Sequence, residues 1–166
     1  IMKKILFLFV FAFVLLTSCT SQETTTYYLI RHAEKDRSDK TNSNPDLNED
    51  GKKRAANWAD YFDDIDLDAV YSTKYNRTMQ TATPTAKSKA LEILNYDPRN
   101  MFDAEFEKAT KGKTVLVVGH SNTTPAFVNK ILGEKKHEDL DDNDNASLFI
   151  VTISGDKKTS RIEKIE

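Results

Sequence analysis

Short apolar runs alternate with segments of helical periodicity along most of the chain. The runs are rich in β-branched or aromatic side chains and are bounded by polar residues, which is typical of buried strands. They predict strands at Tyr27–Ile30, Ala69–Ser72, Leu91–Leu94, Thr114–Val118, Ser147–Ile153 and Arg161–Ile165. Because Ser154-Gly155-Asp156 separates the last two, we expect them to form a hairpin.

Between these runs, apolar residues recur every three or four positions, which predicts amphipathic helices. We expect helices from the cap Asn48 to Asp63 and over Arg77–Lys87, Met101–Ala109 and Pro125–Leu132. Asn48 suits a cap because its side chain can accept a hydrogen bond from the first turn. Pro84 lies inside the second helix and predicts a kink or an early break at Thr83, since proline removes a hydrogen bond and clashes one turn back.

This alternation of strands and helices determines the expected fold class. It predicts an α/β three-layer sandwich, with a mostly parallel central sheet and helices on both faces. In such sheets ligands bind at the carboxyl ends of the strands. We therefore expect one domain over residues 27–166, with its chemistry carried by the polar residues that follow the strands.

The first residues have a different pattern. Lys3 and Lys4 precede an apolar run over residues 5–16, which predicts a signal peptide over residues 1–18. The run is shorter than the roughly 20 residues of a transmembrane helix. We interpret residues 19–26 as a cysteine followed by a flexible polar tether.

The predicted signal peptide ends at a recognisable motif, Leu16-Thr17-Ser18-Cys19. It resembles the lipobox of bacterial lipoproteins. The resemblance implies cleavage before Cys19, diacylglyceryl attachment to its sulfur, and a membrane anchor at a bacterial cell envelope. The alternative is an ordinary secretory signal, with Cys19 there by chance.

Charge and composition exclude several classes of protein. The 166 residues contain 24 Lys and Arg against 26 Asp and Glu, for a net charge of -2. A nucleic-acid binder needs a basic surface, so we expect no nucleic acid as partner. Neither a Gly-rich nucleotide loop nor Cys/His zinc spacing is present, and we expect no cofactor and no metal. The acidic segment 139–145 lacks the glycine and glutamate of a calcium loop, and we interpret it as a solvated turn.

Two histidines and two arginines stand at or near the ends of predicted strands. Arg31 and His32 follow the first strand, Arg77 lies a few residues beyond the second, and His120 follows the fourth. Imidazole is partly unprotonated near neutral pH, so it can attack phosphorus. Guanidinium groups supply a fixed charge and paired donors for the oxygens of a phosphoryl group. Together these residues predict phosphoryl transfer.

Four motifs in order along the chain then identify a family. They are Arg31-His32-Ala33, Leu47-Asn48-Glu49-Asp50-Gly51, Tyr71-Ser72-Thr73 followed by Arg77-Thr78, and Gly119-His120-Ser121-Asn122. This series resembles the histidine phosphatase superfamily, also called phosphoglycerate mutase-like, and its short length resembles the compact phosphohistidine phosphatases. The resemblance implies that His32 becomes a phosphohistidine while Arg31, Arg77 and His120 hold the transferred group.

Some positions depart from the family pattern or remain open. Ala33 replaces the glycine of the family's Arg-His-Gly motif. Glu34 and Lys35 are expected at the rim of the phosphate pocket, with a solvated loop pair as the alternative. Asn122 could donate to a phosphate oxygen or cap the following helix, and the cap is slightly favoured.

The general acid is also open. Asp97, Asp103 and Glu105 are candidates, although a phosphohistidine substrate could react without a dedicated acid. The sequence thus predicts a metal-independent phosphatase for a small phosphorylated substrate or a phosphoprotein. The alternative is a non-catalytic envelope lipoprotein that binds a phosphorylated ligand or partner.

Overall fold

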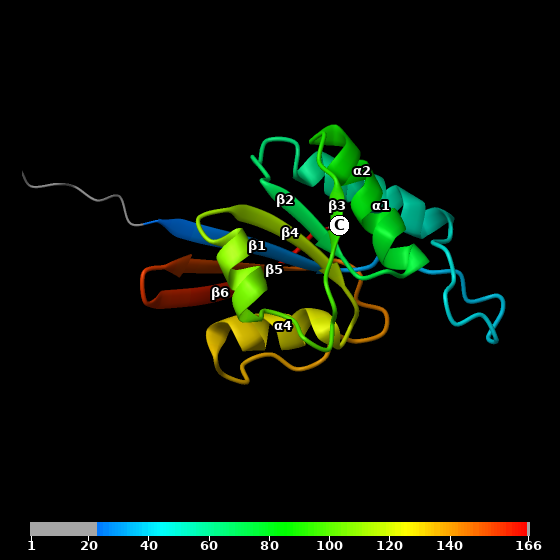
Figure 1. Ribbon diagram of the computed structural model, residues 1–166. Helices are drawn as coiled ribbons and strands as arrows, with labels where there is room; N and C mark the ends of the chain where they lie inside the picture. The colour runs from blue at the N-terminus through cyan, green and yellow to red at the C-terminus, as the bar shows by residue number, and fades with distance from the viewer. Residues whose placement is uncertain (1–22, 166) are drawn as a thin grey trace, which may run out of the picture.

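A six-stranded sheet runs through the computed structural model, which describes residues 23–165 (Figure 1). The strands are β1 (Thr24–Arg31), β2 (Ala69–Ser72), β3 (Ile93–Asn95), β4 (Thr114–Gly119), β5 (Ser147–Ser154) and β6 (Lys157–Lys164). The helices are α1 (Glu49–Tyr61), α2 (Asn76–Ser88), α3 (Ala104–Thr110) and α4 (Thr123–Leu132). Over residues 23–165, no helix combines the length and the apolar character needed to cross a membrane. The predicted signal peptide and Cys19 lie outside the described residues.

The strand order is β3-β2-β4-β1-β5-β6. Strands β3, β2, β4 and β1 are parallel to one another. Strand β5 is antiparallel to β1, and β6 is antiparallel to β5. This arrangement confirms the mostly parallel sheet, and the last two strands form the expected hairpin. Because β1 and β4 lie side by side and parallel, their carboxyl ends meet at one edge of the sheet.

Helices cover both faces of this sheet. In Figure 1, α1 and α2 lie on one side, while α4 and the unlabelled yellow-green helix α3 lie on the other. Side chains alternate along each strand, so Leu29 packs in the core with α3 and α4, whereas Ile30 packs in the core with α1 and α2. The three-layer sandwich is therefore confirmed.

The first strand begins earlier than the apolar pattern predicts. Thr24–Thr26 pair with β5, and the buried Thr25 accepts a hydrogen bond at its Oγ1 from the backbone N–H of Gly112 at 2.8 Å. The prediction that these three residues belong to the flexible tether is wrong. Threonines satisfy the hydrogen bonds of a strand as well as apolar residues do, but they give no apolar signal.

Helix α2 does not break at Pro84, so the early break expected at Thr83 is wrong. Ala82 and Ala86 bury the helix against the core, and Thr83 Oγ1 donates to the carbonyl of Met79 at 2.7 Å. This packing outweighs the local cost of one missing backbone hydrogen bond.

Helix α1 begins against the backbone that follows β1. Asn48 caps it, since its Oδ1 accepts from the N–H of Gly51 at 2.9 Å, and the Asn48 N–H donates to the carbonyl of Glu34 at 3.0 Å. A Cβ at Gly51 would lie 2.1 Å from that same carbonyl oxygen. Glycine is therefore required for the close approach that holds residues 32–34 against α1.

Candidate active site

The pairing of β1 with β4 brings the two histidines together. Arg31 is in register with Gly119, and the His32 N–H donates to the carbonyl of Gly119 at 2.9 Å. The rings of His32 and His120 then lie with centroids 5.5 Å apart. With Arg31 and Arg77 they line one cavity of about 340 Å³ at the carboxyl ends of the strands. The four residues that the sequence singles out thus meet in one place.

His32 is held in a single orientation and a single tautomer. Its side chain is buried, with a residue exposure of 3%, and Nδ1 lies 2.7 Å from the carbonyl oxygen of Ala33. A carbonyl can only accept, so Nδ1 carries the proton and Nε2 carries the lone pair. Burial first, and then the charges of Arg31 and Arg77, lower the pKa of His32 to about 3. The ring is therefore neutral, and nucleophilic at Nε2, near neutral pH.

His120 has the opposite tautomer. Arg77 Nη2 lies 3.4 Å from Nδ1, and Thr73 Oγ1 lies 3.0 Å from Nε2. A guanidinium only donates, so Nδ1 of His120 carries the lone pair and Nε2–H donates to Thr73. Burial first, and then the charge of Arg77, lower the pKa of His120 to about 4. Thr73 thus orients His120, a role that the sequence analysis did not assign.

Arg31 is fixed by the acidic segment that the sequence analysis interprets as a solvated turn. Its Nη1 donates to the carbonyls of Asp141 and Asp142 at 2.9 Å and to that of Asp144 at 3.2 Å. Its Nη2 donates to Asp142 Oδ1 at 3.0 Å. The segment is the exposed turn that was predicted, with residues 141–143 open to solvent. Its binding of the buried guanidinium of Arg31 was not predicted.

Three guanidinium nitrogens at this cavity have no acceptor among the described residues. They are Arg31 Nε, Arg77 Nε and Arg77 Nη1, and all three are buried. The guanidinium of Arg77 is also packed on the ring of Tyr75, with its central carbon 4.6 Å from the ring centroid. Buried donors without acceptors are costly, and buried charged donors more so. The positive charge of Arg31 and Arg77 in the lining of this cavity therefore favours an anionic ligand.

Lys35 lines the same cavity, as its predicted place at the rim requires. Partial burial lowers the pKa of Lys35, and the nearby charges of Arg77 and Arg37 lower it further. Lys35 adds another cation to the site.

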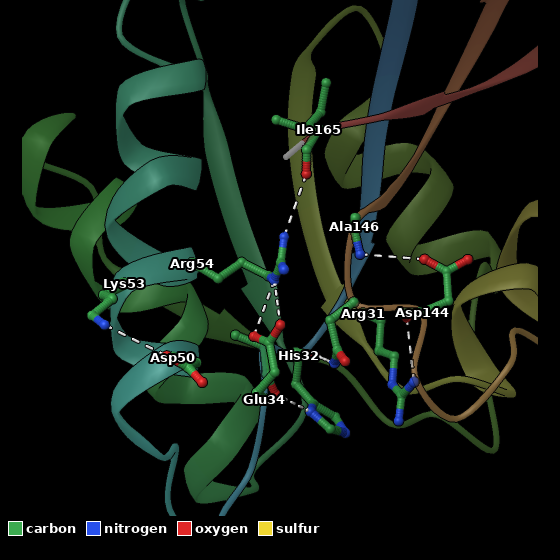
Figure 2. A network of polar contacts seen from close by, with 12 residues as sticks. Arg31, His32, Glu34, Asp50, Lys53, Arg54, Asp144, Ala146 and Ile165 are labelled. Atoms are coloured by element: carbon green, nitrogen blue, oxygen red, sulfur yellow. Dashed lines mark hydrogen bonds and ion pairs between the residues drawn. The ribbon is translucent and has the colours of Figure 1, made fainter.

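Glu34 does not line this cavity. Its carboxylate accepts from Arg54 Nε at 2.8 and 3.0 Å, and Arg54 Nη1 reaches the carbonyl of Ile165 at 3.4 Å. Figure 2 shows Arg54 extending from α1 between these two partners, Glu34 and Ile165. The prediction that Glu34 contacts phosphate is therefore wrong. Its ion pair instead fastens the segment after His32 to α1.

Asn122 lines the histidine cavity, and its side chain does not cap α4. The hydroxyl of Thr123 instead accepts a hydrogen bond from the backbone N–H of His120 at 3.0 Å. The cap interpretation of Asn122 is wrong. Its other predicted role, donation to a phosphate oxygen, is compatible with this position and stays a prediction.

None of the three candidate acids lines the histidine cavity. Asp97 is bonded to Arg99, Asp103 caps α3 by accepting from Phe106 N at 2.8 Å, and Glu105 lines a different cavity. Within residues 23–165, the carboxylate that lines the histidine cavity is that of Asp142. Partial desolvation raises the pKa of Asp142, but its bonds to Arg31 and Arg37 lower it more. Across the same residues, no group of three or more His, Cys, Asp or Glu side chains could hold a metal ion.

Comparison with known proteins agrees with this geometry. The family model of the histidine phosphatase superfamily (branch 1) matches residues 27–99, which include Arg31, His32 and Arg77. Over these residues the chain is similar to the histidine phosphatase superfamily. No curated protein matches the sequence.

Several solved structures share the fold at low sequence identity. A candidate phosphohistidine phosphatase SixA from Agrobacterium tumefaciens has a TM-score of 0.61 and 20% identity, over 84% of this chain and 97% of that one. Phosphoglycerate mutase from Bacillus anthracis has a TM-score of 0.66 and 16% identity, over 87% and 93%. A candidate alpha-ribazole-5'-P phosphatase from Escherichia coli has a TM-score of 0.62 and 15% identity, over 84% and 96%. At these identities the likeness concerns the fold.

Substitution of Thr73 tests its role in orienting His120. Thr73→Val keeps the side-chain shape but removes the acceptor for His120 Nε2–H, so we expect kcat/KM for an aryl phosphate to fall about tenfold. Thr73→Ser keeps the hydroxyl and should retain most of the activity. The measurement is steady-state kinetics together with unfolding midpoints. Loss of activity in Thr73→Ser with activity retained in Thr73→Val would show that the methyl group, and not the hydrogen bond, matters.

Proposed function

We propose that this chain is a metal-independent phosphatase that hydrolyses phosphomonoesters or phosphohistidine through a phosphohistidine formed on His32. The observation that carries the proposal is the pairing of an unprotonated Nε2 with three buried guanidinium nitrogens that have no protein acceptor, all at one cavity. A nucleophile surrounded by unmatched cationic donors suits the transfer of a PO₃ group, whose charge spreads over three oxygens.

In the first step, Nε2 of His32 attacks phosphorus. The new P–N bond forms as the bond from phosphorus to the leaving group breaks, and the electron pair of that bond departs with the leaving group. The guanidinium groups of Arg31 and Arg77, which line the cavity, stabilise the negative charge of the phosphoryl oxygens. Since the Ala33 carbonyl fixes Nδ1–H, it also stabilises the positive charge that develops on the ring.

In the second step, water attacks the phosphorus of the phosphohistidine. The P–N bond breaks with its electron pair returning to Nε2, and the proton lost by the water ends on the released phosphate. His32 returns to its starting tautomer because the hydrogen bond from Nδ1 to Ala33 persists throughout.

The acid–base groups of the cavity favour particular leaving groups. Asp142 is the carboxylate at hand, and its bonds to Arg31 and Arg37 hold it ionised. An ionised carboxylate cannot protonate a departing alkoxide, so the site favours groups that leave readily without an acid. Phosphohistidine has such a leaving group. A phosphoprotein or a small phosphorylated compound of this kind is therefore the proposed substrate.

We also propose that the protein is a lipoprotein of a bacterial cell envelope. The support comes from the signal-like residues 1–18 and from Leu16-Thr17-Ser18-Cys19. A short tether after Cys19 would place the phosphatase domain close to the membrane surface.

Replacement of His32 tests the catalytic proposal. We expect the full chain in detergent to hydrolyse an aryl phosphate in the presence of a chelator and to yield an acid-labile phosphoenzyme. His32→Ala should lose turnover by about 10³-fold or more and form no phosphoenzyme, because the nucleophile is absent. His137→Ala is the matched control, since His137 bonds to Ser160 outside the cavity. A parent chain that binds phosphate without any turnover, on a panel of phosphorylated compounds, would support the non-catalytic alternative.

The pH dependence tests the protonation state of His32. Its lowered pKa, about 3, means that the neutral nucleophile persists as pH falls through the range in which ordinary histidines become charged. The acid limb of kcat/KM, corrected for ionisation of the substrate, should therefore lie below about pH 5. A profile from about pH 4 to about pH 8 measures it. A corrected midpoint near the ordinary histidine pKa would contradict the burial-lowered value.

Replacement of Cys19 tests the anchor. In a bacterial host, the parent chain should be found in the membrane fraction and should incorporate a labelled fatty acid, whereas Cys19→Ser should do neither. Labelling of Cys19→Ser equal to that of the parent would contradict lipidation at this residue.

A further inference from the structure

A second cavity adjoins the one that holds the histidines. Its volume is about 740 Å³, and it is formed by residues that follow β2 and β3. It is lined by Thr73, Lys74, Tyr75, Asn95, Tyr96, Asp97, Pro98 and Arg99. Tyr75 and Pro98 line both cavities, so the two spaces meet at these two rings. We call this second space the Tyr75 groove.

The Tyr75 groove is the adjoining space that suits a carbon skeleton. A further cavity on the other side of His32 has a volume of about 220 Å³, and its lining consists of polar residues such as Arg37, Asn143 and Asn145. The Tyr75 groove is larger and begins with the flat apolar surfaces of Tyr75 and Pro98. The part of a substrate next to the phosphoryl group would contact these two rings first.

The ring of Tyr75 is exposed and yet held in place. Its residue exposure is 41%, although the guanidinium of Arg77 packs against the ring at 4.6 Å. His120 meets it edge to face, with centroids 5.1 Å apart and an interplanar angle of 88°. Such a ring needs little reordering when a ligand packs on it, because its position is already determined by the two catalytic side chains. Aromatic rings favour stacked or edge-to-face contacts with other rings.

Further from the histidine cavity than Tyr75 and Pro98, the lining of the Tyr75 groove is polar. Asp97 is bonded to Arg99 through contacts of 3.0 and 2.9 Å, so its carboxylate is engaged. Lys74 and Asn95 supply donors on the same groove. A flat ring with a polar edge or substituent therefore matches the groove better than a flexible polyol or a fatty chain.

We propose that the Tyr75 groove binds the leaving group of the substrate and selects planar aromatic or heteroaromatic groups, with Tyr75 as a specificity-determining residue. The inference rests on the proposed phosphatase function and deepens it. A second observation points to the same class of leaving group: the histidine cavity has Asp142, bound to two arginines, as its carboxylate and so lacks a general acid.

The chemistry of such leaving groups fits the site. When His32 attacks an aryl phosphate, the P–O bond breaks and its electron pair leaves on the aryl oxygen, where the ring delocalises the charge. With a phosphorylated imidazole protonated on its distal nitrogen, the P–N pair returns to the ring, which departs as neutral imidazole. Neither departure requires a proton from the protein.

Turnover of two probes tests this selectivity. Phenyl phosphate carries the ring, and glycerol phosphate has a flexible alkyl leaving group. We expect Tyr75→Leu to lower the ratio of kcat/KM for phenyl phosphate over glycerol phosphate by about tenfold, while Tyr75→Phe, the matched control, keeps the ratio of the parent chain. A fall in both activities with an unchanged ratio would overturn the proposal, since it would show that Tyr75 supports only Arg77 and His120.

Binding to a variant without turnover separates this inference from the proposed function. In His32→Ala, phenyl phosphate should bind about tenfold more tightly than inorganic phosphate, and adding Tyr75→Leu should abolish that preference. Equal affinity for the two probes in His32→Ala would contradict the leaving-group site. Absence of turnover in the parent chain, together with a Tyr75-dependent preference for the ring, would overturn the phosphatase proposal while the aromatic subsite stands.

Discussion

The pairing of β1 with β4 is the constraint on which the site depends. Two parallel strands in register deliver Arg31-His32 and Gly119-His120 to the same edge of the sheet, and the hydrogen bond from His32 N–H to the Gly119 carbonyl continues the ladder one residue beyond β1. Backbone geometry therefore sets the distance between the histidines before any side chain acts. Both strands are buried in the centre of the sheet, where covering helices on the two faces protect this register.

Two arginine side chains, Arg31 and Arg77, surround the two histidines, and not all of their N–H groups have acceptors among the described residues. Arg31 Nη1 donates to three main-chain carbonyls, and Nη2 donates to the carboxylate of Asp142. Arg31 Nε has no acceptor among the described residues. Arg77 gives one long contact to His120 and otherwise packs on Tyr75. Burial together with these charges keeps both imidazoles neutral, each in the tautomer that its neighbours impose. The same electrostatics that would attract a phosphate also maintain the nucleophile, so binding and reactivity have one origin.

The parts of the structure that sequence patterns predicted are those with a local signal. Apolar runs marked most strands, the Asn48 cap marked α1, and strand-end histidines and arginines marked the site. What the patterns missed depends on contacts between distant segments. Thr24–Thr26 join β1 through pairing with β5, and Arg31 is held by carbonyls more than 100 residues away along the chain. Glu34 follows the Arg31-His32-Ala33 motif directly, but its ion pair with Arg54 holds its carboxylate outside the histidine cavity. Asn122 suits the cap of α4 by residue type, and only the fold shows that its side chain makes no cap bond.

The manner in which the segment before β5 holds Arg31 has a consequence for variation in this protein. The guanidinium donates four hydrogen bonds, and main-chain carbonyls of residues 141–144 accept three of them. Every amino acid has such a carbonyl. Substitutions in residues 141–144 can change the charge of the segment without changing the orientation of the Arg31 side chain, provided that the main chain keeps its path. Insertions and deletions in this segment should disrupt the binding of Arg31, because a shift of the main chain by one residue would displace all three carbonyls together. The segment that binds Arg31 can therefore vary in amino-acid composition but not in length.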